Sequence, residues 1–302
     1  MFLNVIIPSY RAGATIANTI RPILSGLPLK NSAEFSFDIT VVDSSDDNTA
    51  EIVRSEFPDV RVIKLPQRAF PGAARNRGVE ATKGDVICFI DADAVPDRSW
   101  LENIHKYIVE NPGVDAVGGA VLNANPLEGW SRLAHWCEFS GYGLHAPEGL
   151  RRVVPTVNVA IRRSSFMKFG PFLEDQFGNE DVLLFYRMKQ ACSKLHFSRS
   201  IVVYHANKTT LDAIYKHQFK LGESSGRARV LYDLPGKVLT RPGGSLVIPF
   251  IKTSFVGTRI LTQELDEFPR YIVNKLRVFK AMCCFANGFR KGAADARRDA
   301  RA

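Results

Sequence analysis

Two aspartates that follow a predicted buried strand are the residues of this sequence best suited to chemistry. Asp91 and Asp93 stand directly after the apolar run 86–90, and a rigid strand end would project both carboxylates into the same space. Carboxylates at this spacing could hold one divalent cation, directly or through water. A cation there would bind diphosphate oxygens and stabilise the charge of a departing nucleotide. A pair of solvated turn acids has the same spacing, so the pair alone leaves both interpretations open.

The same stretch also fits a different reaction. Asp91-Ala92-Asp93-Ala94-Val95 is similar to the opening motif of haloacid-dehalogenase-type phosphatases, in which the first aspartate is a nucleophile and the second an acid/base. That motif usually lies on the first strand of its domain, whereas several predicted strands come before it here. A phosphatase that uses Asp91 therefore stays an alternative.

Another carboxylate stands at a second strand end. Asp43 follows the apolar residues 39–42 and could accept hydrogen bonds from a ribose or from a base N–H group. Helix capping is the other role open to it, but Ser45, Asp46 and Asp47 already offer caps for the next helix. We therefore expect Asp43 to be available to a ligand.

Two arginines lie on a short helix predicted over residues 73–81. Arg75 and Arg77 place guanidinium groups close to the same sheet edge, where they could neutralise phosphate. A solvated basic face is the alternative, and we favour it for Arg77.

Three later residues are further candidates. Glu180 and Asp181 stand in the first turn of a predicted helix, where the helix dipole alone would favour acids. Their functional interpretation is a general base that takes a proton from an attacking hydroxyl. His205 ends a predicted strand, 201–204, and is either a structural histidine or a metal ligand.

The elements that would position these side chains alternate between strands and helices. This alternation predicts an α/β fold with a mostly parallel sheet sandwiched by helices. In such sheets ligands bind at the carboxyl ends of the strands, which is where Asp43 and Asp91 stand. Residues 123–152 are less regular and rich in aromatics, which indicates an insertion or a substrate-facing subdomain.

The composition is that of a well-cored globular chain with an anionic partner. Of 302 residues 45% are apolar and 24% are charged, and 40 Lys and Arg against 31 Asp and Glu give a net charge of +9.

The sequence contains no dinucleotide fingerprint and no P-loop, which excludes hydride-transfer enzymes and P-loop nucleotide-binding proteins. The basic excess gathers in the tail instead of an aromatic-interleaved surface, so no nucleic acid is expected. Five cysteines without a C-x-x-C pair predict reduced packing thiols.

Residues 268–302 form a basic tail with nine Lys and Arg against two acids. One helical face of the tail is apolar and comprises Ile272, Leu276, Phe279, Cys283 and Ala286. This pattern predicts an in-plane helix on an anionic membrane surface. The alternative is a basic helix packed on the catalytic domain or on a partner subunit.

The sequence predicts neither a signal peptide nor a spanning helix. Residues 1–8 lack a basic lead-in and a long apolar run. The best apolar candidate, 245–261, is interrupted by Pro249, Lys252 and Arg259. We expect a cytoplasmic protein that is peripheral on the inner face of the membrane.

Taken together, these motifs resemble family 2 glycosyltransferases of the GT-A fold. The match runs over roughly residues 3–225, and each motif is modest, but the ordered set is specific. In family order the pieces are Val5-Ile6-Ile7-Pro8-Ser9-Tyr10, Val42-Asp43-Ser44-Ser45-Asp46-Asp47-Asn48-Thr49, Ala74-Arg75-Asn76-Arg77-Gly78, Phe89-Ile90-Asp91-Ala92-Asp93, Asn158-Val159-Ala160-Ile161-Arg162-Arg163, Glu180-Asp181 and His205.

The resemblance implies a role for each of these residues. Residues Pro8 to Tyr10 and Asp43 would hold the nucleoside, and Arg75 would lie near the diphosphate. For the cation, Mn²⁺ or Mg²⁺, it implies Asp93 as a direct ligand, Asp91 facing ribose or metal, and His205 as a further ligand. It also implies Asp181 as the catalytic base, with Glu180 beside it.

The resemblance also implies a domain plan: a GT-A type, Rossmann-like catalytic domain over 1–225, with a nucleotide-binding half (1–120) and an acceptor-binding half (121–225), and a C-terminal helical extension over 226–302. The family inverts configuration at the anomeric carbon, which suits one in-line displacement. Residues 222–226 resemble a segment that closes over the donor in relatives.

Two departures shape the expected activity. Arg11 stands where the family often has Asn, which bears on the contacts at that position. Gln218 to Gly222 does not fit the Q-x-x-R-W motif of processive synthases, and their multiple spanning helices are missing. We therefore expect transfer of a single sugar, favouring a UDP-sugar donor, to a glycan or lipid-linked acceptor. A non-catalytic nucleotide-sugar-binding scaffold is the alternative from another class.

Overall fold

The computed structural model describes residues 1–26, 35–175 and 177–300, and its internal contacts divide the chain into two compact units. Unit 1 comprises Met1–Ala124, Pro147–Asp175 and Glu180–His205, and unit 2 comprises Asn125–Ala146, Gln176–Asn179 and Ala206–Ala302. These units do not test the functional boundaries expected at residues 120 and 225, which stay a prediction.

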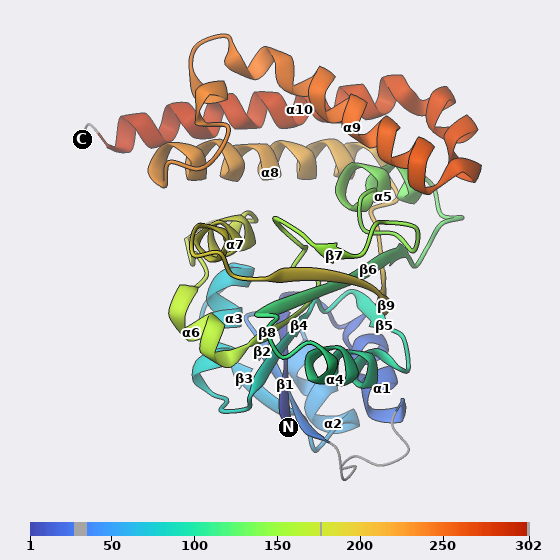
Figure 1. The fold of residues 1–302 in the computed structure, drawn as a ribbon, viewed down its shortest axis with the longest axis vertical. Helices are drawn as coiled ribbons and strands as arrows, with labels where there is room; N and C mark the ends of the chain where they lie inside the picture. Colours follow the sequence, from blue (N-terminus) through green and yellow to red (C-terminus); the bar gives the residue numbers. More distant parts are fainter. Residues whose placement is uncertain (27–34, 176, 301–302) are drawn as a thin grey trace. The chain divides into compact units, whose positions relative to one another are not determined.

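Unit 1 is built on a sheet with the strand order β3-β2-β1-β4-β8-β6-β9-β5, to which β7 adds by pairing with β9 (Figure 1). The strands are β1 (Phe2–Ser9), β2 (Ser36–Asp43), β3 (Arg61–Lys64), β4 (Val86–Ile90), β5 (Ala94–Pro96), β6 (Ala116–Asn123), β7 (Gly149–Leu150), β8 (Asn158–Arg162) and β9 (Leu195–His205). Strands β3, β2, β1 and β4 run parallel, whereas β8 runs antiparallel to β4 and β6.

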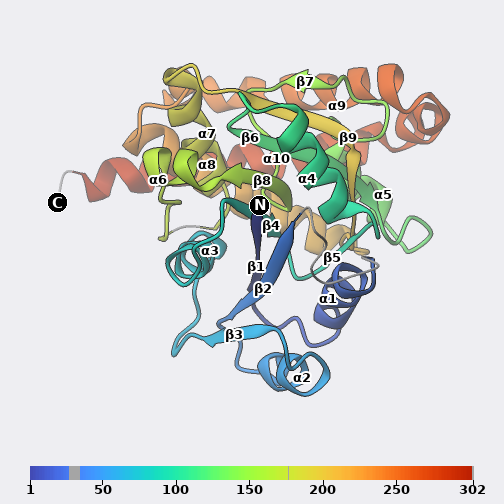
Figure 2. The same ribbon diagram turned by 60° about the horizontal axis from the view of Figure 1, so that its bottom comes forward.

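Helices cover this sheet as the alternating sequence predicted. They are α1 (Ile16–Ser25), α2 (Thr49–Glu56), α3 (Pro71–Glu80), α4 (Trp100–Glu110), α6 (Arg163–Phe169) and α7 (Glu180–Gln190). Figure 2 shows α1 and α2 on one side of β1 and β2, and α3 on the other. All five residues of β4 are buried, as expected for a strand covered on both faces. The predicted α/β fold is therefore confirmed.

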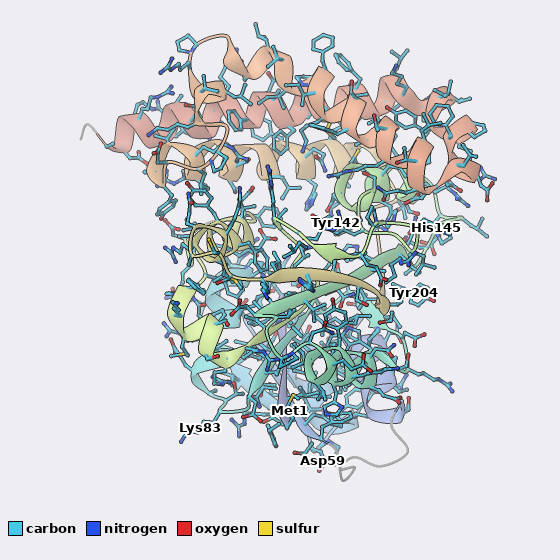
Figure 3. All side chains as sticks on the ribbon, viewed as in Figure 1. Met1, Asp59, Lys83, Tyr142, His145 and Tyr204 are labelled. Atoms are coloured by element: carbon cyan, nitrogen blue, oxygen red, sulfur yellow. The ribbon has the colours of Figure 1, made fainter. Side chains whose placement is uncertain are left out.

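The register of the parallel strands brings several motifs to one edge of the sheet. Ser9 at the end of β1 pairs with Asp43 at the end of β2, and Ile6 pairs with Phe89 one residue before the end of β4. The amino ends of the strands lie away from this edge. Met1, Asp59 and Lys83 stand before β1, β3 and β4, and Tyr204 stands at the carboxyl end of β9, next to His205. Figure 3 shows the first three residues apart from Tyr204.

Some elements differ from the sequence-based expectations. Residues 153–161 have a strand-like sequence, but the strand begins only at Asn158, and no strand was expected where β6, rich in small residues, lies. Its glycines are required by packing, since a Cβ on Gly118 would lie 2.4 Å from the Val154 side chain and one on Gly119 would lie 2.0 Å from the Ile201 carbonyl oxygen. Small residues at a crowded position weaken the apolar pattern by which strands are recognised.

Unit 2 is helical. Its helices are α5 (Ser131–Phe139), α8 (Leu211–Leu231), α9 (Ile248–Gln263) and α10 (Phe268–Asp299), joined by the 3₁₀ turns η1 (Lys237–Thr240), η2 (Gly244–Val247) and η3 (Leu265–Glu267). Helix α10 packs against both α8 and α9. No helix in the described part of the chain has the length and apolar character needed to cross a bilayer.

Helices α8 and α10 approach each other through glycines. A Cβ on Gly222 or Gly226 of α8 would lie 2.0 Å from the carbonyl oxygen of Phe285 or Phe289 of α10. Gly288 and Gly292 of α10 meet the α8 backbone in the same way. Helix α8 therefore continues through these glycines to Leu231, because close backbone packing outweighs their low helix propensity. In this structure Gly222 and Gly226 serve helix packing.

The apolar face predicted for the tail is divided in two. Ala286 is buried in a cluster with Ile248 and Phe289, and Ala281 and Met282 next to the face are buried as well. Ile272 and Leu276, one and two turns from the start of α10, remain exposed. Residues 301–302 lie outside the described residues.

We predict that Gly226→Val loosens the contact between α8 and α10. The added side chain meets backbone that cannot move aside, and overpacking of this kind costs about 2 kcal/mol. The midpoint of urea denaturation should fall accordingly. Ala294→Val, at an exposed position of α10, is the matched control and should leave the midpoint almost unchanged; equal effects of the two variants would contradict the prediction.

Candidate active site

The loop after β4 and the end of β9 bring three metal-ligand side chains together in unit 1. Asp91 and Asp93 follow β4, and the antiparallel pairing of Ala94 with His205 draws Asp93 to the histidine. His205 Nε2 lies 3.4 Å from Asp93 Oδ1. One ligand atom from each of Asp91, Asp93 and His205 lies within 4.8 Å of the others.

This donor set fits a divalent cation. Two oxygen ligands of one octahedral Mg²⁺ ion lie about 3 Å apart when adjacent and about 4.2 Å apart when opposite, so these side chains would have to close around an ion. Two carboxylates and an imidazole suit Mn²⁺ or Mg²⁺ better than they suit a metal that prefers thiolate ligands. His205 is buried, while Asp93 stays open to solvent and could also meet a ligand.

Arg75 connects the loop after β4 to the start of α7. Its Nη2 donates to Asp91 Oδ1 at 2.6 Å, and its Nη1 donates to Glu180 Oε1 at 2.5 Å. The side chain is only 2% exposed. Burial opposes its charge, but the two carboxylates outweigh burial and raise the pKa of Arg75. The bridge brings together motifs that are far apart in the sequence.

Asp181 stands next to this bridge with an unusual pKa. Burial, and next the charge of Glu180, raise the pKa of Asp181 to about 7, although Arg75 and the Val182 N–H, which donates to Asp181 Oδ1 at 2.8 Å, act the other way. A carboxyl group with this pKa takes up and releases a proton near neutral pH, as a general base must. The helix dipole explains acids in the first turn of α7 but does not explain this raised pKa.

Two polar atoms beside the bridge lack partners. Among the residues that the structure describes, Arg75 Nε and Glu180 Oε2 are buried without a hydrogen bond. Buried polar atoms are normally paired, and exceptions gather where a ligand or water completes the network. A water or ligand beside the bridge could therefore supply partners for these two atoms.

Asp43 is held more tightly than the sequence led us to expect. It is 0% exposed, and its Oδ2 accepts from Lys64 Nζ at 2.7 Å. Its Oδ1 accepts from the Ser45 backbone and hydroxyl. Asp47, not Asp43, bonds the start of α2 through Thr49, as the capping argument anticipated. A ligand would reach Asp43 only by exchanging one of its partners.

The Pro8–Tyr10 segment lies beside Asp43. The Ser44 N–H donates to the Ser9 carbonyl at 3.0 Å, and the Arg11 N–H donates to Ser45 Oγ at 2.7 Å. The guanidinium carbon of Arg68 lies 4.4 Å from the centre of the Tyr10 ring. Sequence reasoning missed both Lys64 and Arg68. Their signal was the position of Lys64 at the end of a parallel strand, and of Arg68 in the loop that follows.

The candidate residues therefore form two neighbouring groups on the strand ends. Arg75, Asp91, Asp93, Glu180, Asp181 and His205 gather around the bridge and the metal-ligand cluster. Pro8, Tyr10 and Asp43 gather at the ends of β1 and β2. Arg77 pairs with Glu80 on the exposed face of α3, in line with the solvated role favoured for it.

Comparison with known sequences finds one family. The model of Glycosyl transferase family 2 matches residues 4–170, more than half of the chain. Glycosyltransferase AglE of Haloferax volcanii is 27% identical over 226 residues, which cover 74% of this chain and 72% of that protein. Pre-mycofactocin glycosyltransferase of Mycobacterium tuberculosis is 26% identical over 292 residues, or 93% of this chain, which spans 60% of that protein's length.

Solved structures share the fold. Mannosyltransferase PcManGT from Pyrobaculum calidifontis, in complex with GDP-Man and Mn²⁺, matches 98% of this chain and 87% of its own with a TM-score of 0.62. S. aureus TarS 1–349, in complex with UDP-GlcNAc, matches 99% of this chain and 92% of its own with a TM-score of 0.55. Both are 16% identical to this chain, which shows a common fold and nothing finer.

We predict that Arg75→Met is strongly destabilising. It leaves two carboxylates without their shared cation in a buried place, which costs about 3–5 kcal/mol of the free energy of unfolding. Arg77→Met, on the same helix, removes only an exposed ion pair and should leave the urea midpoint nearly unchanged. If Arg75→Met unfolds at the same urea concentration as Arg77→Met, the bridge is not the constraint described here.

Proposed function

Because the chain belongs to glycosyl transferase family 2, we propose that it moves a single sugar from a nucleotide-diphosphate sugar, favouring a UDP-sugar, to an acceptor hydroxyl with inversion. It is a glycosyltransferase of the GT-A fold. The observation that carries the finer proposal is the Arg75 bridge, which ties the metal-ligand cluster through Asp91 to Glu180 and thus to the base candidate Asp181.

The nucleotide would lie over the ends of β1 and β2. Pro8, Tyr10 and Asp43 are proposed to hold the nucleoside, after Asp43 releases Lys64 or Ser45. Lys64 Nζ would then be available to phosphate, and Arg68 adds a second cation above Tyr10. The nucleotide sugars in the PcManGT and TarS complexes support a donor of this class.

Asp91, Asp93 and His205 are proposed to hold Mn²⁺ or Mg²⁺. Such an ion supplies positive charge for a diphosphate leaving group. The Mn²⁺ in the PcManGT complex supports this, as does the donor set here. Arg75 has both terminal nitrogens engaged by carboxylates, so its proposed place near the diphosphate is that of a positioning residue for Asp91.

The proton of the acceptor hydroxyl would pass to the Asp181 carboxylate. The freed oxygen attacks the anomeric carbon from the side opposite the diphosphate, and the sugar–phosphate C–O bond breaks with its electron pair leaving on the diphosphate. One displacement of this kind inverts the configuration. Burial, and next the charge of Glu180, keeps the pKa of Asp181 high, and Glu180 acts on the base through this charge.

Acceptor and location belong to the same proposal. A glycan or lipid-linked acceptor, cytoplasmic location and contact of residues 268–302 with an anionic membrane at its inner face are proposed together. Only the first part of that predicted apolar face, Ile272 and Leu276, is exposed enough to make the contact. Neither the phosphatase that uses Asp91 nor the scaffold finds support, since the matched relatives are named glycosyltransferases.

We predict that Asp181→Asn loses transfer by about a hundredfold or more but keeps donor binding, as for a lost general base. The measurements are acceptor-dependent release of nucleoside diphosphate and calorimetric titration with UDP-sugars. Asp175→Asn, an exposed acid nearby, is the control and should stay active. Normal transfer by Asp181→Asn would remove Asp181 from this role, whereas lost donor binding would point to misfolding.

The parent protein should show a matching pH dependence. Because the base must be deprotonated, the transfer rate should rise with pH and reach half its plateau near pH 7. Stability should change in the opposite direction: the folded chain keeps a proton on Asp181 that the unfolded chain releases above about pH 4, so the free energy of unfolding falls between about pH 4 and 7. Asp181→Asn should lose this contribution to both profiles.

We predict that Asp93→Ala abolishes metal-dependent donor binding. In a thermal-shift series with UDP- and GDP-sugars, Mn²⁺ should add to the donor-induced stabilisation of the parent but not of this variant. Asp212→Ala, which removes an exposed acid from unit 2, is the control. An undiminished Mn²⁺ effect in Asp93→Ala would contradict the proposed metal site.

A further inference from the structure

The outer face of α9 is apolar and lacks charge. Val247, Phe250, Ile251, Phe255 and Leu261 lie at helical spacing on η2 and α9, and all are exposed. Phe250 is 63% and Phe255 is 60% exposed, which is rare for phenylalanine on a folded surface. The other exposed residues of this helix are Ser254, Thr258, Arg259 and Thr262.

Of the two charged residues of α9, Lys252 packs inward, whereas Arg259 is exposed at the flank of this face. Lys252 Nζ lies 4.2 Å from the centre of the Phe285 ring of α10, in surroundings where burial lowers its pKa to about 8. The guanidinium of Arg259 lies over Gly141, where a Cβ would be 2.9 Å from its Cζ. The helix therefore keeps its charges at its flanks and leaves its outward surface apolar.

The start of α10 extends this surface. Tyr271 Oη donates to the Thr253 carbonyl at 2.9 Å, and the rings of Phe250 and Phe279 are 5.0 Å apart, so the two helices run antiparallel side by side. Ile272 and Leu276 lie on the same helical face as Phe279, and Leu276 is 82% exposed. We call the seven residues Val247, Phe250, Ile251, Phe255, Leu261, Ile272 and Leu276 the apolar face.

The segments that carry the apolar face hold cations and no acids. Residues 241–263 contain three Lys and Arg and residues 268–294 contain six, and neither segment contains Asp or Glu. The turn between them holds three acids, Glu264, Asp266 and Glu267, of which Glu267 is paired with Arg132 and Arg270. An exposed apolar strip flanked by cations is complementary to an anionic bilayer, where apolar residues enter the acyl boundary and cations meet headgroups.

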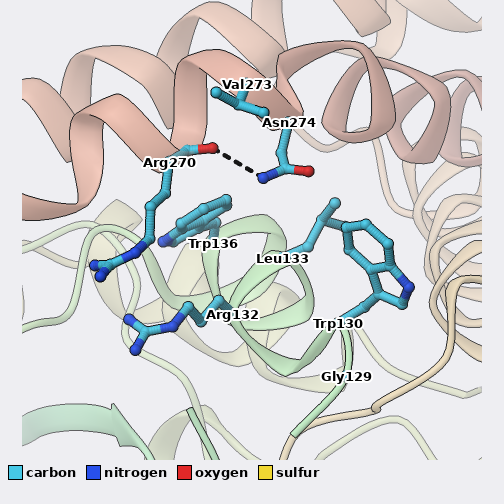
Figure 4. Close-up of a pocket in the computed structure, with 8 residues that line it drawn as sticks. All are labelled: Gly129, Trp130, Arg132, Leu133, Trp136, Arg270, Val273 and Asn274. Atoms are coloured by element: carbon cyan, nitrogen blue, oxygen red, sulfur yellow. Dashed lines mark hydrogen bonds between the residues drawn. The ribbon is translucent and has the colours of Figure 1, made fainter. Parts of the chain in front are cut away.

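A cavity beside the start of α10 adds a place for a headgroup. It has a volume of about 240 Å³ and lies between α5 and α10, lined by Trp130, Leu133, Trp136 and Val273 and by the polar residues Arg132, Arg270 and Asn274. Figure 4 shows the guanidinium groups of Arg132 and Arg270 on the same side of this cavity. Together they exceed the single negative charge of Glu267, so an anionic phosphate can be accommodated there.

We propose that the apolar face docks in the plane of an anionic lipid bilayer, with α9 as the main contact. This deepens the proposed membrane contact of residues 268–302: Ile272 and Leu276 contribute, but the rest of the tail's predicted face packs inside unit 2. The inference does not depend on sugar transfer, so a failure of the transferase assays leaves it standing.

The test measures sedimentation of the full chain with large vesicles of phosphatidylcholine, with and without about 30% phosphatidylglycerol. The parent should pellet with the anionic vesicles, and added NaCl should weaken binding through the flanking cations. Ile251→Glu combined with Phe255→Glu should lower the partition coefficient about tenfold or more, because two charges replace apolar contacts at the acyl boundary.

Matched controls separate this surface from general stickiness. Leu127→Glu combined with Met167→Glu changes two residues that are 90% and 69% exposed but lie outside the apolar face, and should bind as the parent does. Thermal melts should show all variants folded, since every changed side chain is exposed. Arg270→Gln combined with Arg277→Gln should weaken binding about threefold or more and reduce its salt dependence.

Three outcomes would overturn the proposal. The first is absence of parental binding to anionic vesicles, and the second is unchanged binding by the Ile251/Phe255 variant. The third is a dimer, measured by light scattering, that the same variant dissociates while no vesicle binding occurs, because that would assign the apolar face to a second copy of the chain.

Discussion

One buried guanidinium fixes the geometry of the candidate site. Arg75 is removed from water, and the cost of burying its charge is met only while Asp91 and Glu180 both contact it. Those carboxylates come from the loop after β4 and from the first turn of α7, which belong to the same unit but are far apart in the sequence. The ion pairs thus restrain two elements that a hydrophobic core alone would position less exactly, because apolar packing is not directional.

The same bridge accounts for the electrostatic state of the site. Asp91, Glu180 and Asp181 share one guanidinium, so negative charge is in excess around it. Burial raises the pKa of Asp181 most, and the charge of Glu180 raises it further, against the smaller opposing effect of Arg75. A divalent cation on Asp91, Asp93 and His205 would restore the balance on the opposite side of the bridge. The excess charge is therefore consistent both with a carboxyl group that accepts protons near neutral pH and with a demand for a cation.

The sequence was sufficient for the parts of the site that depend on strand ends. Asp91, Asp93 and His205 follow or end apolar runs, and strand ends of one sheet meet at one edge, so their meeting could be predicted. The partners of Arg75 could not be predicted, because a guanidinium on a helix can turn to phosphate, to solvent or to any acid within reach.

Asp43 was expected to be available to a ligand because other residues nearby could cap the next helix, yet Lys64 from the neighbouring strand forms an ion pair with it. The antiparallel insertion of β8 between β4 and β6 also left no local signal.

An amphipathic pattern predicts that the apolar face of a helix is covered, but not which part of the chain or which partner covers it, and the tail is an example. The face from Ile272 to Ala286 is continuous in sequence, but Ile248 of α9 packs against its end, beside Ala286 and Phe289, and its first part stays open. The covering is possible because α8 and α10 touch at the backbone, a contact that holds α10 in place beneath α9. The glycines that allow this contact are Gly222, Gly226, Gly288 and Gly292.

The sequence of α9 resembles an interrupted membrane-spanning segment, because Pro249, Lys252 and Arg259 break its apolar run. In the folded chain Pro249 occupies the first turn, where its missing N–H costs nothing, and the two cations lie at the flanks. The residues that interrupt the apolar run are thus placed so that one face of the helix stays uncharged. Such a helix is suited to lie on a membrane rather than to cross it.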